Sequence, residues 1–207
     1  MPTVFVIDDD DSVRKSLSRL LRSEGLESES HKSAASYLAR EAHDGTACIL
    51  LDINMPGMSG IELQARLAEQ GHDVPIIFLT GHGNVSTSVT AMKRGALDFL
   101  IKPVDEADLL RAVRHALDHH RHVREVSNKR DAILARMDSL TPREREVMQQ
   151  LITGALNKLI ADELRIAIKT VKVHRAHVMK KMGVRSVAEL LHLCYLAGIE
   201  PGDEFTS

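Results

Sequence analysis

The sequence predicts a doubly wound α/β domain with a parallel sheet, followed by a small all-α domain. In the first half, short apolar runs alternate with segments whose apolar residues recur at three- and four-residue steps. In the second half only the helical spacing recurs. With 207 residues, of which 43% are hydrophobic, the chain is long enough for two small domains with packed cores.

Four apolar runs in the first half are expected to be buried parallel strands, and each run ends at a polar residue. The runs are residues 4–7, 49–51, 76–79 and 99–101, and the residues that follow them are Asp8 with Asp9, Asp52, Thr80 and Lys102. Strands that are covered on both faces are apolar throughout, and the loops at their carboxyl ends share one edge of the sheet. The polar residues are therefore expected to meet in one crevice.

The residue types in this crevice favour phosphate chemistry. The carboxylates of Asp8, Asp9 and Asp52 repel one another, and this repulsion favours a hard divalent cation with oxygen ligands. Such a cation can also hold a phosphoryl oxygen, while Thr80 supplies a hydroxyl group and Lys102 an ammonium group. The set is expected to form a site for a phosphorylated aspartate.

Helices are expected between these strands. Their apolar positions are Val13, Leu17, Leu20 and Leu21; Ile61, Leu63 and Leu67; Val85, Val89 and Met92; and Leu109, Leu110, Val113 and Leu117. The last of these helices begins near residues 105–108, where acidic residues suit a helix N-terminus. Asp11 is expected to cap the first helix, which begins near Ser12.

These motifs resemble the receiver domain of two-component response regulators over residues 1–118. The matching segments are V-F-V-I-D-D-D-D-S-V-R, L-L-D-I-N-M-P-G-M-S-G, F-L-T-G-H-G and D-F-L-I-K-P. The resemblance implies a flavodoxin-like, five-stranded sheet with Asp52 as the phosphoacceptor. It also implies a Mg²⁺ or Mn²⁺ ion held by Asp8, Asp9, Asp52 and the backbone carbonyl of Asn54.

The resemblance assigns further roles around the acceptor. Thr80 and Lys102 would bind phosphoryl oxygens, and Phe99 would be a rotameric switch that turns inward when Thr80 moves. Asn54 and His82 would flank the water that attacks the acyl phosphate and so set its lifetime. The Lys102–Pro103 peptide bond would be cis.

Residues 119–138 are predicted to join the two domains. The run His119-His120-Arg121-His122 lacks a partner cluster and continues a charged helical pattern, which favours a solvated helix over a metal site. Three- and four-residue steps relate Val123, Val126, Ile133 and Met137. The segment is either a long helix that pairs with its twin or a loose linker, and the sequence leaves both open.

The second domain, residues 139–207, is expected to contain four helices. The first begins with a capping box formed by Thr141 and Glu144, with Pro142 in the first turn. The others are expected over Asn157–Leu164, Lys169–Met182 and Val187–Ala197. The segments L-T-P-R-E-R-E-V, N-K-L-I-A-D-E-L and K-T-V-K-V-H-R-A-H-V-M-K-K-M resemble the LuxR-type helix-turn-helix of the NarL and FixJ regulators.

Helical spacing separates an inward and an outward side of the helix over Lys169–Met182. Val171, Val178 and Met182 are expected inside, and the opposite side is expected to enter the major groove of DNA. The expected DNA contacts are Asn157, Lys158, Lys169, Thr170, Lys172, Val173, Arg175, Ala176, His177 and Lys180. Among these, lysines would meet phosphates or a guanine acceptor, and Val173 and Ala176 would allow contact with a thymine methyl group.

Two helix starts depart from the family pattern, which commonly places a small hydroxyl residue there. This chain has Leu156 and Ala167, and neither side chain can accept a capping hydrogen bond. Each missing cap typically costs ~1 kcal/mol. Asn157 is an alternative cap for the first of the two helices if that helix starts later.

Charge also differs between the two halves. Residues 1–118 hold 12 Lys and Arg against 18 Asp and Glu, whereas residues 119–207 hold 15 against 11. This asymmetry favours a polyanion as the partner of the second half. Cys48 and Cys194 have neither metal-site nor disulfide spacing, and both are expected to be core residues.

Together these features predict a DNA-binding response regulator that is not an enzyme. A sensor histidine kinase would phosphorylate Asp52, and the phosphorylated chain would form a homodimer on a two-fold promoter operator and act with RNA polymerase. No apolar run approaches ~18 residues and no signal segment is present, so a cytoplasmic protein without membrane contact is expected. The alternatives are a metal-dependent phosphotransfer or phosphatase enzyme with an aspartyl-phosphate intermediate, and a receiver that acts by protein contact alone.

Overall fold

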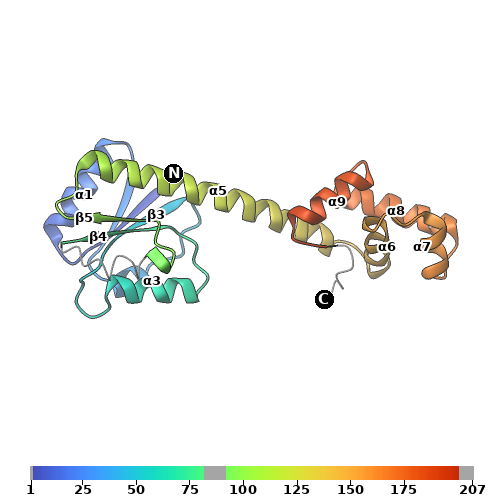
Figure 1. Ribbon diagram of the computed structural model, residues 1–207, viewed down its shortest axis with the longest axis horizontal. Helices are drawn as coiled ribbons and strands as arrows, with labels where there is room; N and C mark the ends of the chain where they lie inside the picture. The colour runs from blue at the N-terminus through green and yellow to red at the C-terminus, as the bar shows by residue number, and fades with distance from the viewer. Residues whose placement is uncertain (1, 82–91, 201–207) are drawn as a thin grey trace. The chain divides into compact units, whose positions relative to one another are not determined.

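A five-stranded parallel sheet forms the centre of the first unit of the chain (Figure 1). Its strands are β1 (Thr3–Ile7), β2 (Glu27–His31), β3 (Ala47–Asp52), β4 (Ile76–Thr80) and β5 (Asp98–Ile101), in the order β2-β1-β3-β4-β5. The computed structural model describes residues 2–81 and 92–200, and the chain divides into two compact units between Arg124 and Glu125. The predicted doubly wound α/β fold is confirmed for the first unit.

Helices cover both faces of the sheet, which explains why its central strands are apolar throughout. The helices are α1 (Asp11–Ser23), α2 (Ala34–Leu38), α3 (Gly60–Glu69) and the first part of α5 (Glu106–Asp138). Side chains from α1 and α5 form one core with Val4, Val6, Cys48, Leu50, Ile77 and Leu79. Side chains from α2 and α3 form the other core with Phe5, Ile7, Ile49, Leu51 and Phe78.

Two expectations about the helices of this unit need comment. The N-cap of α1 is Asp10 and not Asp11, because the Asp10 carboxylate accepts hydrogen bonds from the backbone N–H groups of Ser12 and Val13. The predicted helix with Val85 and Val89 lies largely outside the described residues.

Helix α5 continues without interruption from Glu106 to Asp138, so the segment predicted as a linker is helical. The expected apolar stripe is only partly buried: Ile133 and Met137 are 5% exposed, whereas Val126 is 52% exposed. Ile133 and Met137 belong to the core of the second unit.

The prediction of a solvated helix for residues 119–122 is wrong for His120, whose side chain is 1% exposed. Its Nδ1 atom accepts a hydrogen bond from the backbone N–H of Ala47 at 2.8 Å, and Nε2 lies 3.7 Å from an oxygen of Asp73. Burial lowers the pKa of His120 below its usual value, although the charge of Asp73 opposes this shift. Thus His120 holds α5 to the first residue of β3.

Up to residue 200, where the description of the second unit ends, four further helices are present, as predicted: α6 (Pro142–Ile152), α7 (Asn157–Glu163), α8 (Ile168–Met182) and α9 (Val187–Leu196). The capping box between Thr141 and Glu144 is present at the start of α6. Leu156 and Ala167 are the N-cap residues of α7 and α8, and neither makes a side-chain capping bond. Asn157 therefore does not replace the missing cap.

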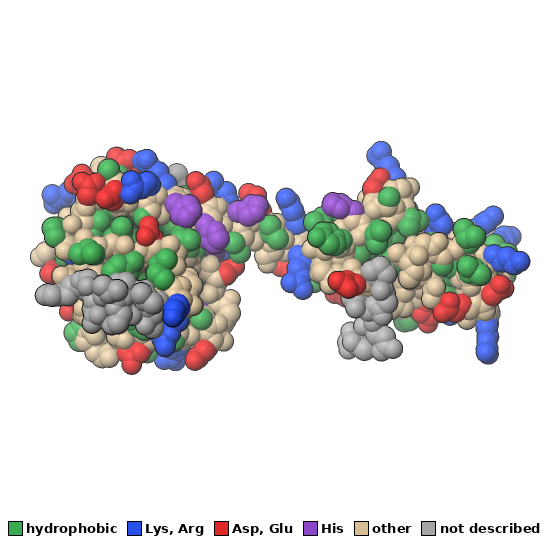
Figure 2. Space-filling view, viewed as in Figure 1, with side chains coloured by type: hydrophobic (Ala, Val, Ile, Leu, Met, Phe, Trp, Pro, Cys, Tyr) green, Lys and Arg blue, Asp and Glu red, His purple; other side chains and the backbone are tan. Residues whose placement is uncertain are grey.

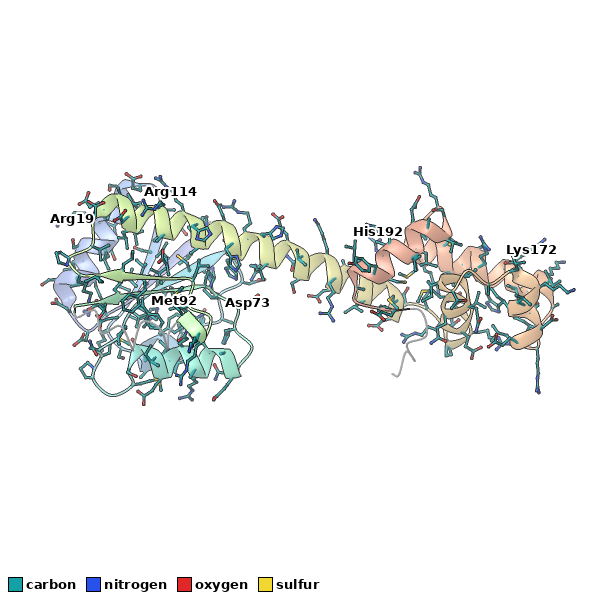
Figure 3. The ribbon with its side chains drawn as sticks, viewed as in Figure 1. Arg19, Asp73, Met92, Arg114, Lys172 and His192 are labelled. Carbon is teal, nitrogen blue, oxygen red and sulfur yellow. The ribbon has the colours of Figure 1, made fainter. Side chains whose placement is uncertain are left out.

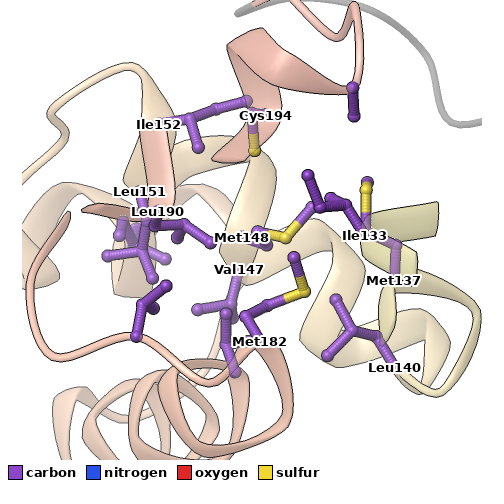
Figure 4. Close-up of a cluster of buried hydrophobic side chains, with 14 of the residues drawn as sticks. Ile133, Met137, Leu140, Val147, Met148, Leu151, Ile152, Met182, Leu190 and Cys194 are labelled. Atoms are coloured by element: carbon purple, nitrogen blue, oxygen red, sulfur yellow. The ribbon is translucent and has the colours of Figure 1, made fainter. Parts of the chain in front are cut away.

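The core of the second unit joins the end of α5 to the other helices (Figure 4). Its buried residues include Ile133, Met137, Leu140, Val147, Met148, Leu151, Ile152, Met182 and Leu190. Cys194 is buried in the same cluster and Cys48 in the first unit, as predicted for core cysteines, and both are free thiols. Within the described residues, no helix is both long and apolar enough to cross a bilayer.

Candidate functional site

Strands β1, β3 and β5 bring Asp8, Asp52 and Lys102 together at the carboxyl edge of the sheet. The Lys102 Nζ atom lies 2.6 Å from Oδ2 of Asp8 and 2.6 Å from Oδ1 of Asp52. Both carboxylates are buried, because Asp8 is 1% and Asp52 6% exposed. The structure therefore brings these three residues together in one crevice, as predicted.

Backbone N–H groups fix the orientation of both carboxylates. Oδ1 of Asp8 accepts from the N–H of Asp10 at 2.9 Å, and Oδ2 of Asp52 accepts from the N–H of Asn54 at 2.7 Å. The second oxygen of each carboxylate is thereby turned toward the Lys102 ammonium. Because both of these oxygens contact the same nitrogen atom, the two carboxylates lie close to each other.

These neighbours stabilise the charged form of the Lys102 side chain. Partial burial alone would lower the pKa of the ammonium group, but hydrogen bonds and charge attraction from Asp52 and Asp8 raise it above its usual value. Lys102 is therefore a positive charge placed beside the predicted acceptor oxygen.

Thr80 ends β4 at the same edge and is 1% exposed. Its backbone carbonyl accepts a hydrogen bond from the N–H of Lys102 at 2.7 Å, which joins the ends of β4 and β5. Phe99 on β5 is partly buried and contacts the core on the α2 and α3 side of the sheet. The Lys102–Pro103 bond is cis, as the resemblance implied.

Two residues that the sequence analysis did not single out shape the loops after β1 and β3. Arg14 is 14% exposed at its side chain, and its guanidinium donates to the backbone carbonyl of Asp8 at 2.7 Å. A Cβ atom on Gly60 would lie 2.3 Å from the backbone oxygen of Asp52, so only glycine lets α3 start this close to β3. The available signal for Arg14 was its position as a basic residue in the first turn of the helix that follows Asp8.

The oxygen atoms of Asp8 and Asp52 fit a hard divalent cation such as Mg²⁺, which takes oxygen ligands and usually keeps several waters. Asp9 and Asn54 are exposed on the adjoining loops. Among the described residues, no group of three His, Cys, Asp or Glu side chains is arranged as a metal site, so Asp9 does not complete a three-carboxylate cluster. His82 lies outside the described residues.

In the second unit, α8 has the predicted inward and outward sides. Val171, Val178 and Met182 are fully buried. Exposed positions are Lys169, Thr170, Lys172, Val173, Ala176, His177 and Lys180, and Lys158 is exposed on α7. Figure 3 shows Lys172 on the outside of α8, and Figure 2 shows Lys and Arg side chains along α7 and α8.

Three of the predicted DNA contacts already have polar side-chain neighbours within the protein. Arg175 is half-buried and donates from Nη1 to Oδ1 of Asn157 at 3.3 Å, which joins α8 to the start of α7. His177 is 56% exposed at its side chain, and its Nδ1 atom lies 3.3 Å from Oε1 of the buried Glu144. These contacts place both residues at the edges of the outward side of α8.

Comparisons with known proteins assign both units. Residues 4–114 match the response regulator receiver domain, and residues 138–194 match the bacterial regulatory proteins of the luxR family. The transcriptional regulatory protein FixJ of Azorhizobium caulinodans is 44% identical over 203 residues, which cover 98% of this chain and 96% of that protein. Nodulation protein W of Bradyrhizobium diazoefficiens is 44% identical over 196 residues, or 95% of this chain and 86% of that protein. Among solved structures, the response regulator StyR has a TM-score of 0.87 at 46% identity, and the match covers 94% of this chain and 98% of that one.

Proposed function

Because the chain belongs to the family of FixJ-type transcriptional response regulators, with a receiver domain and a LuxR-type DNA-binding domain, we propose that phosphorylation of Asp52 controls its action on promoter DNA. The observation that carries this proposal is the position of the Lys102 ammonium, 2.6 Å from both Asp8 and Asp52. The lysine ammonium at the end of parallel strands is placed to bind a phosphoryl oxygen, and the two carboxylates beside it can hold a divalent cation that offsets the remaining negative charge.

The phosphoryl donor is a phosphohistidine of a sensor kinase. Oδ1 of Asp52 attacks the phosphorus atom while the bond from phosphorus to the imidazole nitrogen breaks. Asn54 supports the reaction by donating its backbone N–H to the other oxygen of Asp52. Lys102 then moves its hydrogen bond to a phosphoryl oxygen, and the Thr80 hydroxyl binds a second one.

A Mg²⁺ or Mn²⁺ ion held by Asp8, Asp52 and the Asn54 carbonyl, with Asp9 turning toward the ion as it binds, would neutralise charge on the phosphoryl oxygens. Phosphorylation adds about −1.5 to −2 charges to a crevice that is already acidic. The proposed response is movement of Thr80 toward the phosphoryl group, which opens space for Phe99 to turn inward. Asn54 and His82 are proposed to set how long the acyl phosphate survives.

The output is dimerisation on a two-fold operator, with RNA polymerase as the further partner. Joining two weakly binding domains raises the effective affinity without new contacts to bases. Lys158, Lys169 and Lys180 are proposed to contact phosphates, and Lys172, Val173 and Ala176 to contact bases. We propose no enzymatic turnover, since the relatives are transcriptional regulators.

The test is acyl-phosphate labelling of the full chain with Mg²⁺ present, followed by mass measurement. Wild type is expected to gain one phosphoryl group, and Asp52→Asn none. Asp118→Asn is the matched control, because Asp118 is 68% exposed and lies on α5. Beryllofluoride treatment is expected to produce dimers by sizing and to strengthen DNA binding. A folded wild-type chain that takes up no phosphoryl group, or labelling that persists in Asp52→Asn, overturns the proposal.

A further inference from the structure

Glu144 is a buried carboxylate in the first turn of α6, and it joins α6 to the C-terminal part of α8. Its side chain is 5% exposed. Oε2 accepts hydrogen bonds from the Lys181 ammonium at 2.6 Å and from the backbone N–H of Thr141 at 2.9 Å. The hydrogen bond from Lys181 lowers the pKa of Glu144 to about 2, so the carboxylate is charged at neutral pH.

The other oxygen of Glu144 is directed at a residue on the outward side of α8. Oε1 lies 3.3 Å from Nδ1 of His177, whose side chain is 56% exposed. A carboxylate accepts but cannot donate, so Nδ1 of the imidazole is the nitrogen that would donate to Glu144 when it carries a proton. The ring therefore turns its second nitrogen, Nε2, away from Glu144.

His177 lies on the same side of α8 as Val173 and Lys180, because these positions are one turn before and one turn after it. The charged or titratable groups around it are Glu144 on α6 and His174, Lys180 and Lys181 on α8. A DNA phosphate on the open side of the ring would add a second anion next to the imidazole.

We propose that Glu144 is a positioning residue of the DNA interface, which holds His177 so that its protonated ring bridges Glu144 and a DNA phosphate oxygen. This inference rests on the proposed DNA-binding function. Nδ1–H donates to Glu144 and Nε2–H to the phosphate, so binding takes up a proton wherever the free imidazole is neutral.

The test is the affinity of the full chain for a duplex that is selected from a random-sequence pool by the beryllofluoride-treated protein. Wild type is expected to bind about tenfold more tightly as the pH falls from about 8 to about 6. His177→Gln, an exposed substitution, is expected to lose most of this dependence. His192→Gln, at an exposed position on α9, is the matched control and is expected to retain it.

A double-mutant cycle distinguishes positioning from a purely structural role of Glu144. Glu144→Gln is expected to weaken binding in the wild-type background and to have no further effect on binding when His177 is already Gln. The ¹⁵N resonances of His177 supply a readout without DNA, because the contact with Glu144 requires a proton on Nδ1, and this readout does not depend on whether Glu144→Gln folds.

Three outcomes overturn the inference. They are equal pH dependence of binding in His177→Gln and wild type, an equal loss of affinity from Glu144→Gln in both backgrounds, and a neutral His177 ring with its proton on Nε2. If wild type binds the selected duplex and Lys172→Ala does not, the DNA-binding function stands whatever His177 does. If wild type binds no DNA even at low salt, the proposed function fails and this inference with it.

Discussion

The ammonium group of Lys102 separates two buried carboxylates that would otherwise repel each other. We predict that Lys102→Met lowers the free energy of unfolding of the first unit by about 3 kcal/mol, because Asp8 and Asp52 lose their shared partner. We also predict that Mg²⁺ raises the stability of this variant more than that of wild type, since a cation between the two carboxylates replaces the lost charge. Urea unfolding with EDTA and with excess Mg²⁺ measures both effects.

Lys32→Met is the control for this substitution, because Lys32 is exposed at the end of β2. Its stability should match that of wild type in both buffers. An equal response of wild type and Lys102→Met to Mg²⁺ would show that the cation does not bind where the ammonium lies.

At the scale of single elements, α8 begins without a side-chain cap. We predict that Ala167→Ser raises the stability of the second unit by ~1 kcal/mol, because the introduced hydroxyl would accept a hydrogen bond from a backbone N–H in the first turn of α8. Thermal unfolding measures the change. Ala132→Ser, at an exposed position inside α5, should slightly lower the midpoint, and an unchanged or lower midpoint in Ala167→Ser contradicts the expected cap.

The last turns of α5 belong to the core of the second unit, and this gives a second prediction for an element. Ile133→Ala is expected to cost about 2–4 kcal/mol of stability, because Ile133 is 5% exposed among the core residues in Figure 4. Val126→Ala, on the same helix at 52% exposure, is expected to cost less than about 1 kcal/mol. Urea unfolding of the full chain compares the two, and similar losses would mean that α5 does not contribute to this core.

The elements also show which strands an apolar sequence pattern can predict and which it cannot. Residues 4–7, 49–51 and 76–79 are predictable as strands because both of their faces are covered by helices. Strand β2 has no such pattern in its residues Glu27–His31, because it is an edge strand that pairs only with β1. Its presence followed from the family resemblance and not from apolar spacing.

The candidate site was likewise predictable from the sequence only in part. Asp52 and Thr80 end strands and Asp8 and Lys102 directly follow strands, so the parallel order of the strands alone brings them to one edge. His120 and Arg14 were missed because each makes a hydrogen bond to a backbone group, and helical spacing carries no information about such partners. Glu144 was recognised only as a cap, since its contacts with Lys181 and His177 depend on how α6 packs on α8.

At the scale of the whole molecule, charge is distributed unevenly although the net charge is only −2. We predict that the affinity for DNA falls linearly with salt on logarithmic axes, because basic side chains of the second half displace counterions from phosphates. Lys180→Ala is expected to reduce the slope by about 1 for each bound protomer. Lys32→Ala, in the acidic half, should leave the slope unchanged, and a slope that is the same in wild type and Lys180→Ala would exclude a phosphate contact at that residue.

Both native thiols are enclosed in cores, and burial raises the pKa of Cys48 to about 12 and that of Cys194 above its usual value. Thiolate formation, and hence reaction with maleimides, is suppressed at both positions near neutral pH. A cysteine introduced at an exposed position, such as Tyr195 at 78% exposure, would therefore take up a fluorophore selectively without prior removal of the native thiols. Distance measurements between dyes on two chains could then follow assembly in real time with an otherwise unaltered protein.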